Sequence, residues 1–238
     1  MKNSLNIIGR GQLAQAFQSS ILRNACIFVS GVSDSSCQET KEFERERSLL
    51  VETLKNNSDK KFVYFSSCAL SAPNYPKNAY YDHKVNMEML LKEYSNNYYI
   101  FRIPQLFGEL KHHKTLINFL YESISKEESF KVYSDAYRYV VEIYDVRKLV
   151  EAYLLHYESC VSVDLANTYR YKVTEIIKIF EKLMGKKALY ALIEKEDQYT
   201  LDLSVMLAFM KKLGIDTDFG EEYLMKKLAE KIALKSTK

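Results

Sequence analysis

The chain has 238 residues, 47% of them hydrophobic, which is enough to bury the core of one α/β domain with a modest second lobe. Its 34 Lys and Arg residues against 31 Asp and Glu leave a formal net charge of +3, spread along the chain, which argues against a nucleic-acid partner. Four cysteines without paired spacing indicate a reducing compartment and no metal site. No apolar run reaches the length of a signal peptide or membrane span, so we expect a cytoplasmic protein away from any membrane.

The N-terminal half alternates short apolar runs with amphipathic stretches. We predict strands at residues 5–8, 25–29, 62–65 and 98–103. Helices are predicted between them, at residues 12–22, 40–54 and 80–94. Apolar strands that alternate with helices indicate a parallel sheet that is covered on both faces.

The pattern changes after Gly108. It predicts helices at 116–125, from Val146 and at 173–184, strands at 130–132, 139–143 and 161–165, and a final strand with one or two helices. The predicted fold class is α/β, a Rossmann-like doubly wound parallel sheet with a small C-terminal α+β substrate lobe. Within one unit of 1–238, residues 1–108 form the core, to which parts of 139–166 return, and residues 109–138 and 167–238 form the smaller lobe.

A glycine turn, Gly9-Arg10-Gly11-Gln12-Leu13-Ala14, separates the first predicted strand from the first predicted helix. Its G-x-G-x-x-A pattern lets the backbone approach a pyrophosphate at the positive end of a helix. A tight turn without any ligand is the alternative. Arg10 could stack on adenine or pair with the extra phosphate of NADP, or it could be a solvated surface residue.

Tyr80 and Lys84 lie four residues apart near the start of a predicted helix, so their side chains share one face. A phenol donates a proton to a carbonyl more readily when a neighbouring ammonium lowers its pKa. The same spacing occurs at Tyr144/Lys148 and Tyr223/Lys227. Only the helix of Tyr80 follows a strand that ends in two serines, so its context selects this pair.

Several blocks of the sequence, in order, resemble the NAD-dependent epimerase/dehydratase family, the nucleotide-sugar branch of the extended short-chain dehydrogenases/reductases. The blocks are residues 7–11 (IIGRG), 62–67 (FVYFSS), 80–84 (YYDHK), 101–108 (FRIPQLFG), 138–146 (RYVVEIYDV), 201–204 (LDLS) and 212–214 (KLG). Together they cover nearly the whole chain. Each block is weak, and their common order carries the resemblance.

The resemblance implies a role for each matching residue. Tyr80 would be the proton donor or acceptor, Lys84 would lower its pKa and hold the nicotinamide ribose, and Ser67 would contact the substrate oxygen. The cofactor would be bound by Gly9, Arg10, Gly11, Gln12, Leu13, Ser30, Gly31, Lys84 and Ile103. The nucleotide-sugar substrate would be bound by Ser67, Gln105 and Arg138, because a bidentate guanidinium suits a diphosphate.

Two of these residues also have purely structural interpretations. Arg138 could form an ion pair with Asp145 between the two lobes, and Ser67 could cap a turn. The segment 28–33 resembles the family's fourth strand, whose end faces the cofactor, and this is the reason for including Ser30 and Gly31.

The chain departs from the family between the first helix and the strand at 25–29. Family members usually place two more strands and a helix there, so a substantial segment is missing. The acidic residue that normally holds the adenosine ribose is therefore absent, and Asp34 is a poor substitute. Without an acidic partner that repels a 2′-phosphate, we expect NADP to bind at least as well as NAD.

The predicted chemistry is the delivery or removal of hydride at a sugar carbon. Related 4,6-dehydratases carry Asp-Glu directly after the active-site hydroxyl residue, whereas Cys68 and Ala69 stand there in this chain, which argues against dehydration. We expect Cys68 to be a buried structural thiol. The hypotheses are an NAD(P)-dependent nucleotide-sugar ketoreductase or epimerase of cell-surface carbohydrate biosynthesis and, alternatively, a catalytically degenerate dinucleotide-binding regulatory or assembly protein. By analogy we expect a homodimer, formed through the helices at 40–54 and 80–94, although the apolar stripes of these helices could equally cover the sheet.

Overall fold

The computed structural model describes residues 4–73, 75–111 and 115–236. The chain divides into two compact units, each of which gathers segments that are distant in sequence. The first unit comprises Met1–Ile103 with Ile143–Leu165, and the second comprises Pro104–Glu142 with Ala166–Lys238. No helix in the described part of the chain is both long and apolar enough to cross a bilayer.

The first unit is built on a five-stranded parallel sheet in the order β1-β2-β3-β4-β8. Its strands are β1 (Leu5–Ile8), β2 (Ala25–Phe28), β3 (Lys61–Ser67), β4 (Tyr98–Ile103) and β8 (Val161–Asp164). The central strands are buried along nearly their whole length, as expected for a parallel sheet with both faces covered. The predicted Rossmann-like α/β fold is confirmed.

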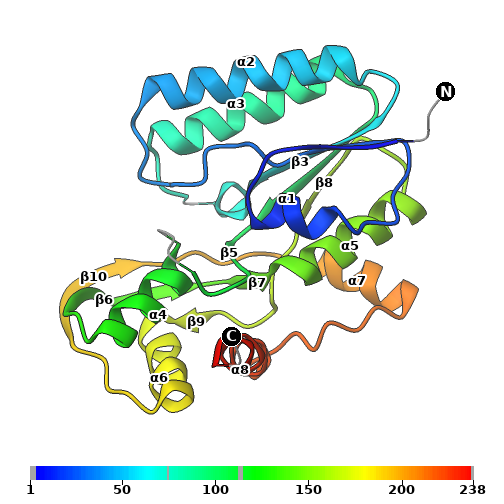
Figure 1. Ribbon diagram of the computed structural model, residues 1–238. Helices are drawn as coiled ribbons and strands as arrows, with labels where there is room; N and C mark the ends of the chain where they lie inside the picture. Colours follow the sequence, from blue (N-terminus) through cyan, green and yellow to red (C-terminus); the bar gives the residue numbers. More distant parts are fainter. Residues whose placement is uncertain (1–3, 74, 112–114, 237–238) are drawn as a thin grey trace. The chain divides into compact units, whose positions relative to one another are not determined.

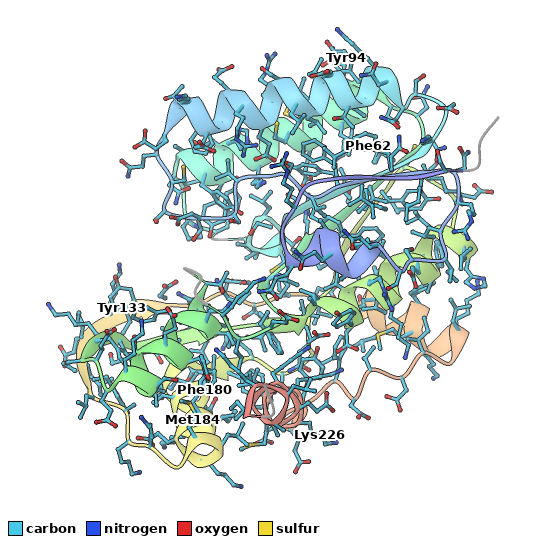
Figure 2. The ribbon with its side chains drawn as sticks, viewed as in Figure 1. Phe62, Tyr94, Tyr133, Phe180, Met184 and Lys226 are labelled. Carbon is cyan, nitrogen blue, oxygen red and sulfur yellow. The ribbon has the colours of Figure 1, made fainter. Side chains whose placement is uncertain are left out.

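Helices cover the two faces of this sheet (Figure 1). On one face, α2 (Thr40–Asn56) and α3 (Ala79–Tyr94) pack on side chains that include Phe28, Phe62 and Ile100. On the other face, α1 (Gln12–Phe17) and α5 (Ile143–His156) pack beside each other. Figure 2 shows Phe62 in the layer of side chains next to α3.

The faces are assigned by the alternation of side chains along the strands. Phe65 contacts the ring of Phe17 in α1, and Phe101 contacts that of Tyr153 in α5. The neighbouring side chains along the same strands, Tyr64 and Ile100, belong to the core beneath α2 and α3.

The first two crossover connections of the sheet have opposite hands. Both step in the same direction, from β1 to β2 and from β2 to β3, but α1 and α2 lie on opposite faces of the sheet. The β2–α2–β3 and β3–α3–β4 connections share a face and a direction, and therefore a hand. Connections between neighbouring parallel strands are almost always right-handed. If the β2–α2–β3 and β3–α3–β4 connections follow this rule, the β1–α1–β2 connection is left-handed, which is rare.

Helix α1 ends at Phe17, so the prediction that it extends to residue 22 was wrong. Arg147 of α5 donates to the backbone oxygen of Ala16 at 2.9 Å and to Ser19 Oγ at 2.6 Å. The Ala16 carbonyl is the one that Ser20 N–H would use in a continuing α-helix. Ser20 N–H bonds the Phe17 carbonyl instead, and the chain leaves the helix toward β2.

The second unit has two small sheets and a set of helices. Strand β6 (Phe130–Arg138) lies between β10 (Tyr190–Asp197) and β9 (Tyr171–Lys172), while β5 (Gln105–Phe107) pairs with β7 (Val140–Glu142). The strand predicted at 130–132 therefore extends to Arg138, and the strand predicted at 139–143 is reduced to β7. The helices are α4 (Leu116–Lys126), α6 (Val173–Met184), α7 (Ser204–Leu213) and α8 (Tyr223–Ser236). Phe180 of α6, labelled in Figure 2, is fully buried in the core of this unit.

Candidate functional site

The predicted catalytic residues lie in the first unit, at the carboxyl end of β3 and the beginning of α3. Ser67 is the last residue of β3 and is half-buried. Asn78 starts α3 by accepting a hydrogen bond from Tyr81 N–H at 3.0 Å, as N-cap residues do. This cap places Tyr80 in the first turn and Lys84 in the second. Both are buried, with exposed fractions of 7% and 2%.

The Lys84 ammonium is bonded within the protein. Its Nζ donates to Glu46 Oε1 at 3.0 Å, to Glu46 Oε2 at 3.3 Å and to Tyr64 Oη at 3.2 Å. An ammonium has three donors, so these contacts account for its hydrogen-bonding capacity. Lys84 can meet a ligand only if one of these bonds is exchanged.

Glu46 of α2 is the centre of this cluster and is fully buried. Besides Lys84, it accepts hydrogen bonds from Val32 N–H at 2.6 Å and from Tyr64 Oη at 2.7 Å, and its Oε2 lies 2.9 Å from His83 Nε2. Burial by itself raises the pKa of Glu46. The contacts with His83, Lys84, Val32 and Tyr64 outweigh burial and lower the pKa to about 2, so Glu46 is a buried carboxylate at neutral pH.

The loop after β2 closes over this ion pair. A methyl group on Gly31 would lie 2.8 Å from Lys84 Nζ and 2.9 Å from Glu46 Oε1, so only glycine fits here without displacing the pair. Gly31 also lines a hollow of about 600 Å³, and the other lining residues are Val32, Ser33, Asp34, Ser36, Cys37, Gln38 and Glu39 of the loop and Glu42 and Arg45 of α2. A ligand in this hollow would lie next to Gly31.

Tyr80 lies close to several ionisable groups, and Lys84 Nζ is 5.7 Å from the centre of its ring. Burial is the largest influence on the Tyr80 hydroxyl, followed by Tyr81, Glu46, Cys68 and Asp34, and all of them raise its pKa. This direction is opposite to the lowering by Lys84 that the family resemblance implies. A raised pKa favours the phenol form of Tyr80 over the phenolate. The predicted buried state of Cys68 is confirmed, since its exposed fraction is 0%.

The two glycines of the turn in the first unit, Gly9 and Gly11, differ in the space around their Cα atoms. Gly9 has φ +145°, and a Cβ there would lie 2.5 Å from the carbonyl oxygen of Val29, so it permits close packing of the turn on β2. A Cβ on Gly11 would meet no atom within 4 Å, which leaves open space beside the turn. Arg10 is exposed between them, and Gln12 and Leu13 are half-buried.

The sheet ends at β1. In the described residues no strand lies beyond it, so this chain offers no further strand end to carry an acidic partner for the adenosine ribose. In the Rossmann fold such strands continue the sheet on this side of β1. Asp34 Oδ1 accepts hydrogen bonds from Ser36 N–H and Ser36 Oγ, at 2.9 and 2.6 Å.

The predicted substrate residues Gln105 and Arg138 belong to the second unit. Gln105 begins β5, and its backbone N–H bonds the carbonyl of Tyr139 at 3.2 Å. Arg138 forms an ion pair with the carboxylate of Asp197 and donates to the backbone oxygens of Tyr137 and Asp197, each at 2.8 Å. Its partner is therefore Asp197 and not Asp145. The roles of both residues toward a substrate stay predictions.

Sequence reasoning missed Glu46, Tyr64 and His83. One signal was present: Phe43, Glu46, Leu50 and Leu54 recur at helical spacing, so a carboxylate stands within the apolar stripe of a predicted helix. A charged side chain is seldom fully buried unless it is paired, so Glu46 called for a buried cation. The residue next to His83, Lys84, supplies it.

No family model matches the chain, and no curated protein resembles it in sequence. Solved structures resemble it in fold. UDP-N-acetylglucosamine 4-epimerase from Bacillus cereus has a TM-score of 0.72 at 16% identity and covers 97% of this chain and 86% of its own. dTDP-glucose 4,6-dehydratase from Bacillus anthracis, in complex with NAD, has a TM-score of 0.71 at 12% identity. The match covers 94% of this chain and 77% of the dehydratase chain.

A third structure is RMD from Pseudomonas aeruginosa complexed with NADPH, with a TM-score of 0.69 at 13% identity and coverage of 94% and 87%. The chain therefore has the fold of NAD-dependent nucleotide-sugar epimerases and dehydratases, as the family resemblance predicts. Identities of 12–16% show the fold alone.

Proposed function

We propose that this protein is an NAD(P)-dependent enzyme that reduces or epimerises a nucleotide-linked sugar in cell-surface carbohydrate biosynthesis. The observation that carries the proposal is the placement of Tyr80 and Lys84 in the first two turns of α3, the helix that follows β3 and its terminal Ser67. Structures of the same fold are complexed with NAD or NADPH. In this proposal Tyr80 transfers a proton to or from the sugar oxygen, and Ser67 donates a hydrogen bond to that oxygen.

The glycine turn fits a dinucleotide pyrophosphate. Gly9 lets the turn pack against Val29, and the open space beside Gly11 leaves room for phosphate oxygens. The other proposed cofactor contacts are Arg10, Gln12, Leu13, Ser30, Gly31, Lys84 and Ile103. A bound nicotinamide dinucleotide would supply or accept hydride. The contact between Lys84 and its ribose requires the ammonium to exchange one of its bonds to Glu46 or Tyr64.

Arg10 should make NADP(H) bind at least as well as NAD(H). It is exposed in the glycine turn, and the sheet offers no strand beyond β1 whose carboxylate would repel a 2′-phosphate. Arg10→Ala should weaken NADP(H) binding by about 1–3 kcal/mol, the range for a lost charge-assisted hydrogen bond, and should affect NAD(H) less. Calorimetric titration of both cofactors measures these losses in affinity. Repeating it at a higher salt concentration should reduce the difference between NADP(H) and NAD(H), because salt screens the charge of Arg10. Equal losses for the two cofactors would refute the phosphate contact.

A second candidate function is a regulatory or assembly protein that has lost catalysis. Two observations favour it: the Lys84 ammonium is saturated by Glu46 and Tyr64, and the sheet ends at β1. Under this alternative the cluster around Glu46 only stabilises the fold.

Cofactor content and turnover separate the two functions. The purified protein should carry NAD(P), visible in its absorbance spectrum and by mass analysis, and it should oxidise NADPH when it is given 4-keto nucleotide sugars from a panel. A protein that neither carries nor binds a dinucleotide, and that leaves the whole panel unchanged, would support the second candidate.

Location and assembly are also proposals. We propose a cytoplasmic homodimer that uses α2 and α3. The outward positions of α2 are largely charged, among them Lys41, Glu44, Arg47 and Glu52, so salt-sensitive association is expected. Sedimentation at low and high salt would measure it.

A further inference from the structure

Reduction and epimerisation make opposite demands on Tyr80. A reductase must give a proton to the oxygen that was a carbonyl oxygen, and a phenol does this. An epimerase that first oxidises its substrate must remove a proton from a sugar hydroxyl, which requires a phenolate. The charges that surround Tyr80 therefore bear on which of the two reactions the site performs.

Lys84 supplies the ammonium of this cluster, and its charge is matched at short range, while Arg45 of α2 is a further cation near it. Glu46 Oε1 lies 3.0 Å from Lys84 Nζ, whereas the Tyr80 ring centre lies 5.7 Å from it. In a buried site a carboxylate this close offsets the field of the ammonium at Tyr80. Besides burial, the groups that raise the pKa of Tyr80 include Tyr81, Glu46, Cys68 and Asp34.

Contacts other than the one with Lys84 also hold the Glu46 carboxylate in place. Val32 N–H and Tyr64 Oη hold it at 2.6 and 2.7 Å, and His83 Nε2 contacts it at 2.9 Å. His83 in turn stacks on Phe43, with ring centres 4.6 Å apart. Residues of α2, β3, α3 and the loop after β2 therefore keep Glu46 beside Lys84.

We propose that Glu46 is a positioning residue that neutralises Lys84 and thereby keeps Tyr80 protonated, so that the site reduces a keto sugar and does not epimerise a sugar alcohol. This inference rests on the proposed function. It selects one of the two reactions and gives Glu46 a role that follows from its place beside Lys84.

The step balances with a reduced nicotinamide dinucleotide as the reductant. The carbonyl carbon of the substrate gains a hydride, and its oxygen gains the proton of Tyr80 Oη. The products are the sugar alcohol, the oxidised dinucleotide and the Tyr80 phenolate. A proton taken up from solvent then restores the Tyr80 phenol, so the net reaction consumes one proton.

The first test is an ultraviolet titration of tyrosinate between pH 7 and 10 on the cofactor-free protein, comparing wild type with Tyr80→Phe. The two curves should coincide over this range, because Tyr80 remains a phenol while ordinary tyrosines begin to ionise near pH 10. A wild-type curve that exceeds the Tyr80→Phe curve by one tyrosinate below about pH 9 would overturn the proposal.

Glu46→Gln provides the complementary variant, since the amide removes the negative charge and keeps the shape. Ionisation of one tyrosine should move to lower pH by about one unit or more, and the change should be absent from Glu46→Gln/Tyr80→Phe. No movement in a folded Glu46→Gln protein would refute the role of Glu46. If that variant does not fold, the comparison of wild type with Tyr80→Phe still decides the protonation state.

The direction of reaction is tested on the wild-type enzyme. NADPH-dependent reduction of a 4-keto nucleotide sugar should exceed epimerisation of the corresponding sugar alcohol, measured with NAD or NADP, by at least about tenfold. Epimerisation at an equal or higher rate would overturn the inference while supporting the proposed function. Absence of both reactions, with no dinucleotide bound, would instead contradict the proposed function, and the titration would show separately whether Tyr80 is a phenol.

Discussion

Tyr80→Phe should lower turnover by about two to four orders of magnitude, the usual contribution of a positioned general acid, with little change in the fold. The ring of Tyr80 is buried and meets the Tyr81 ring edge-on at 5.1 Å, and phenylalanine keeps both contacts. Only the hydroxyl group is lost, and with it the proton that Tyr80 would transfer. Steady-state rates with a 4-keto nucleotide sugar and NADPH measure the effect, and thermal unfolding checks the fold.

Tyr144→Phe is the matched control, because the same Tyr-x-x-x-Lys spacing occurs there and Tyr144 is 48% exposed on α5. Its turnover should equal that of the wild type. Tyr223→Phe is a poorer control, although the catalytic turnover of this variant should also be unchanged. The Tyr223 hydroxyl accepts a buried hydrogen bond from Glu142 N–H at 2.9 Å, so its loss affects stability. A Tyr80→Phe enzyme with the wild-type rate would remove Tyr80 from the mechanism.

Glu46→Leu should destabilise the protein by about 3–5 kcal/mol, because it leaves the Lys84 ammonium buried without a counter-charge. Lys84→Met should cost less, since Glu46 keeps its contacts with Val32, Tyr64 and His83. The double variant should recover part of the loss, because both charges of the pair are then gone. Urea unfolding of the four proteins at pH 7 gives these values. An equal loss of unfolding free energy in the two single variants would contradict the central place of Glu46 in the cluster.

The difference between wild type and Glu46→Leu should also depend on pH. The pKa of Glu46 is lowered from 4.5 to about 2 in the folded protein. The resulting stabilisation, on the order of 3 kcal/mol, is fully present above the unfolded pKa and is lost as the pH falls toward 2. Repeating the unfolding measurements between pH 6 and 3 tests this. A difference that stays constant over the range would show that the Glu46 charge is not the source of the stability.

The sequence determined most of the α/β architecture. Residues 25–29 and 62–65 are continuous apolar runs, and such runs between amphipathic segments form the buried strands of a parallel sheet, as β2 and β3 do. The placement of Tyr80 and Lys84 on one side of α3 also follows from a local rule, because a four-residue spacing puts two side chains on the same helix face. These features depend on neighbours in the chain, so the sequence alone predicts them.

The tertiary structure decided what the local pattern does not contain. Helix α1 ends at Phe17, where Arg147, far along the chain, bonds the Ala16 carbonyl. Arg138 pairs with Asp197 rather than Asp145 because β6 and β10 lie side by side. Lys84 meets Glu46 because α2 and α3 pack on the same face of the sheet. The charge state around Tyr80 depends on groups that folding brings together from separate elements, and local spacing gives no measure of such distances.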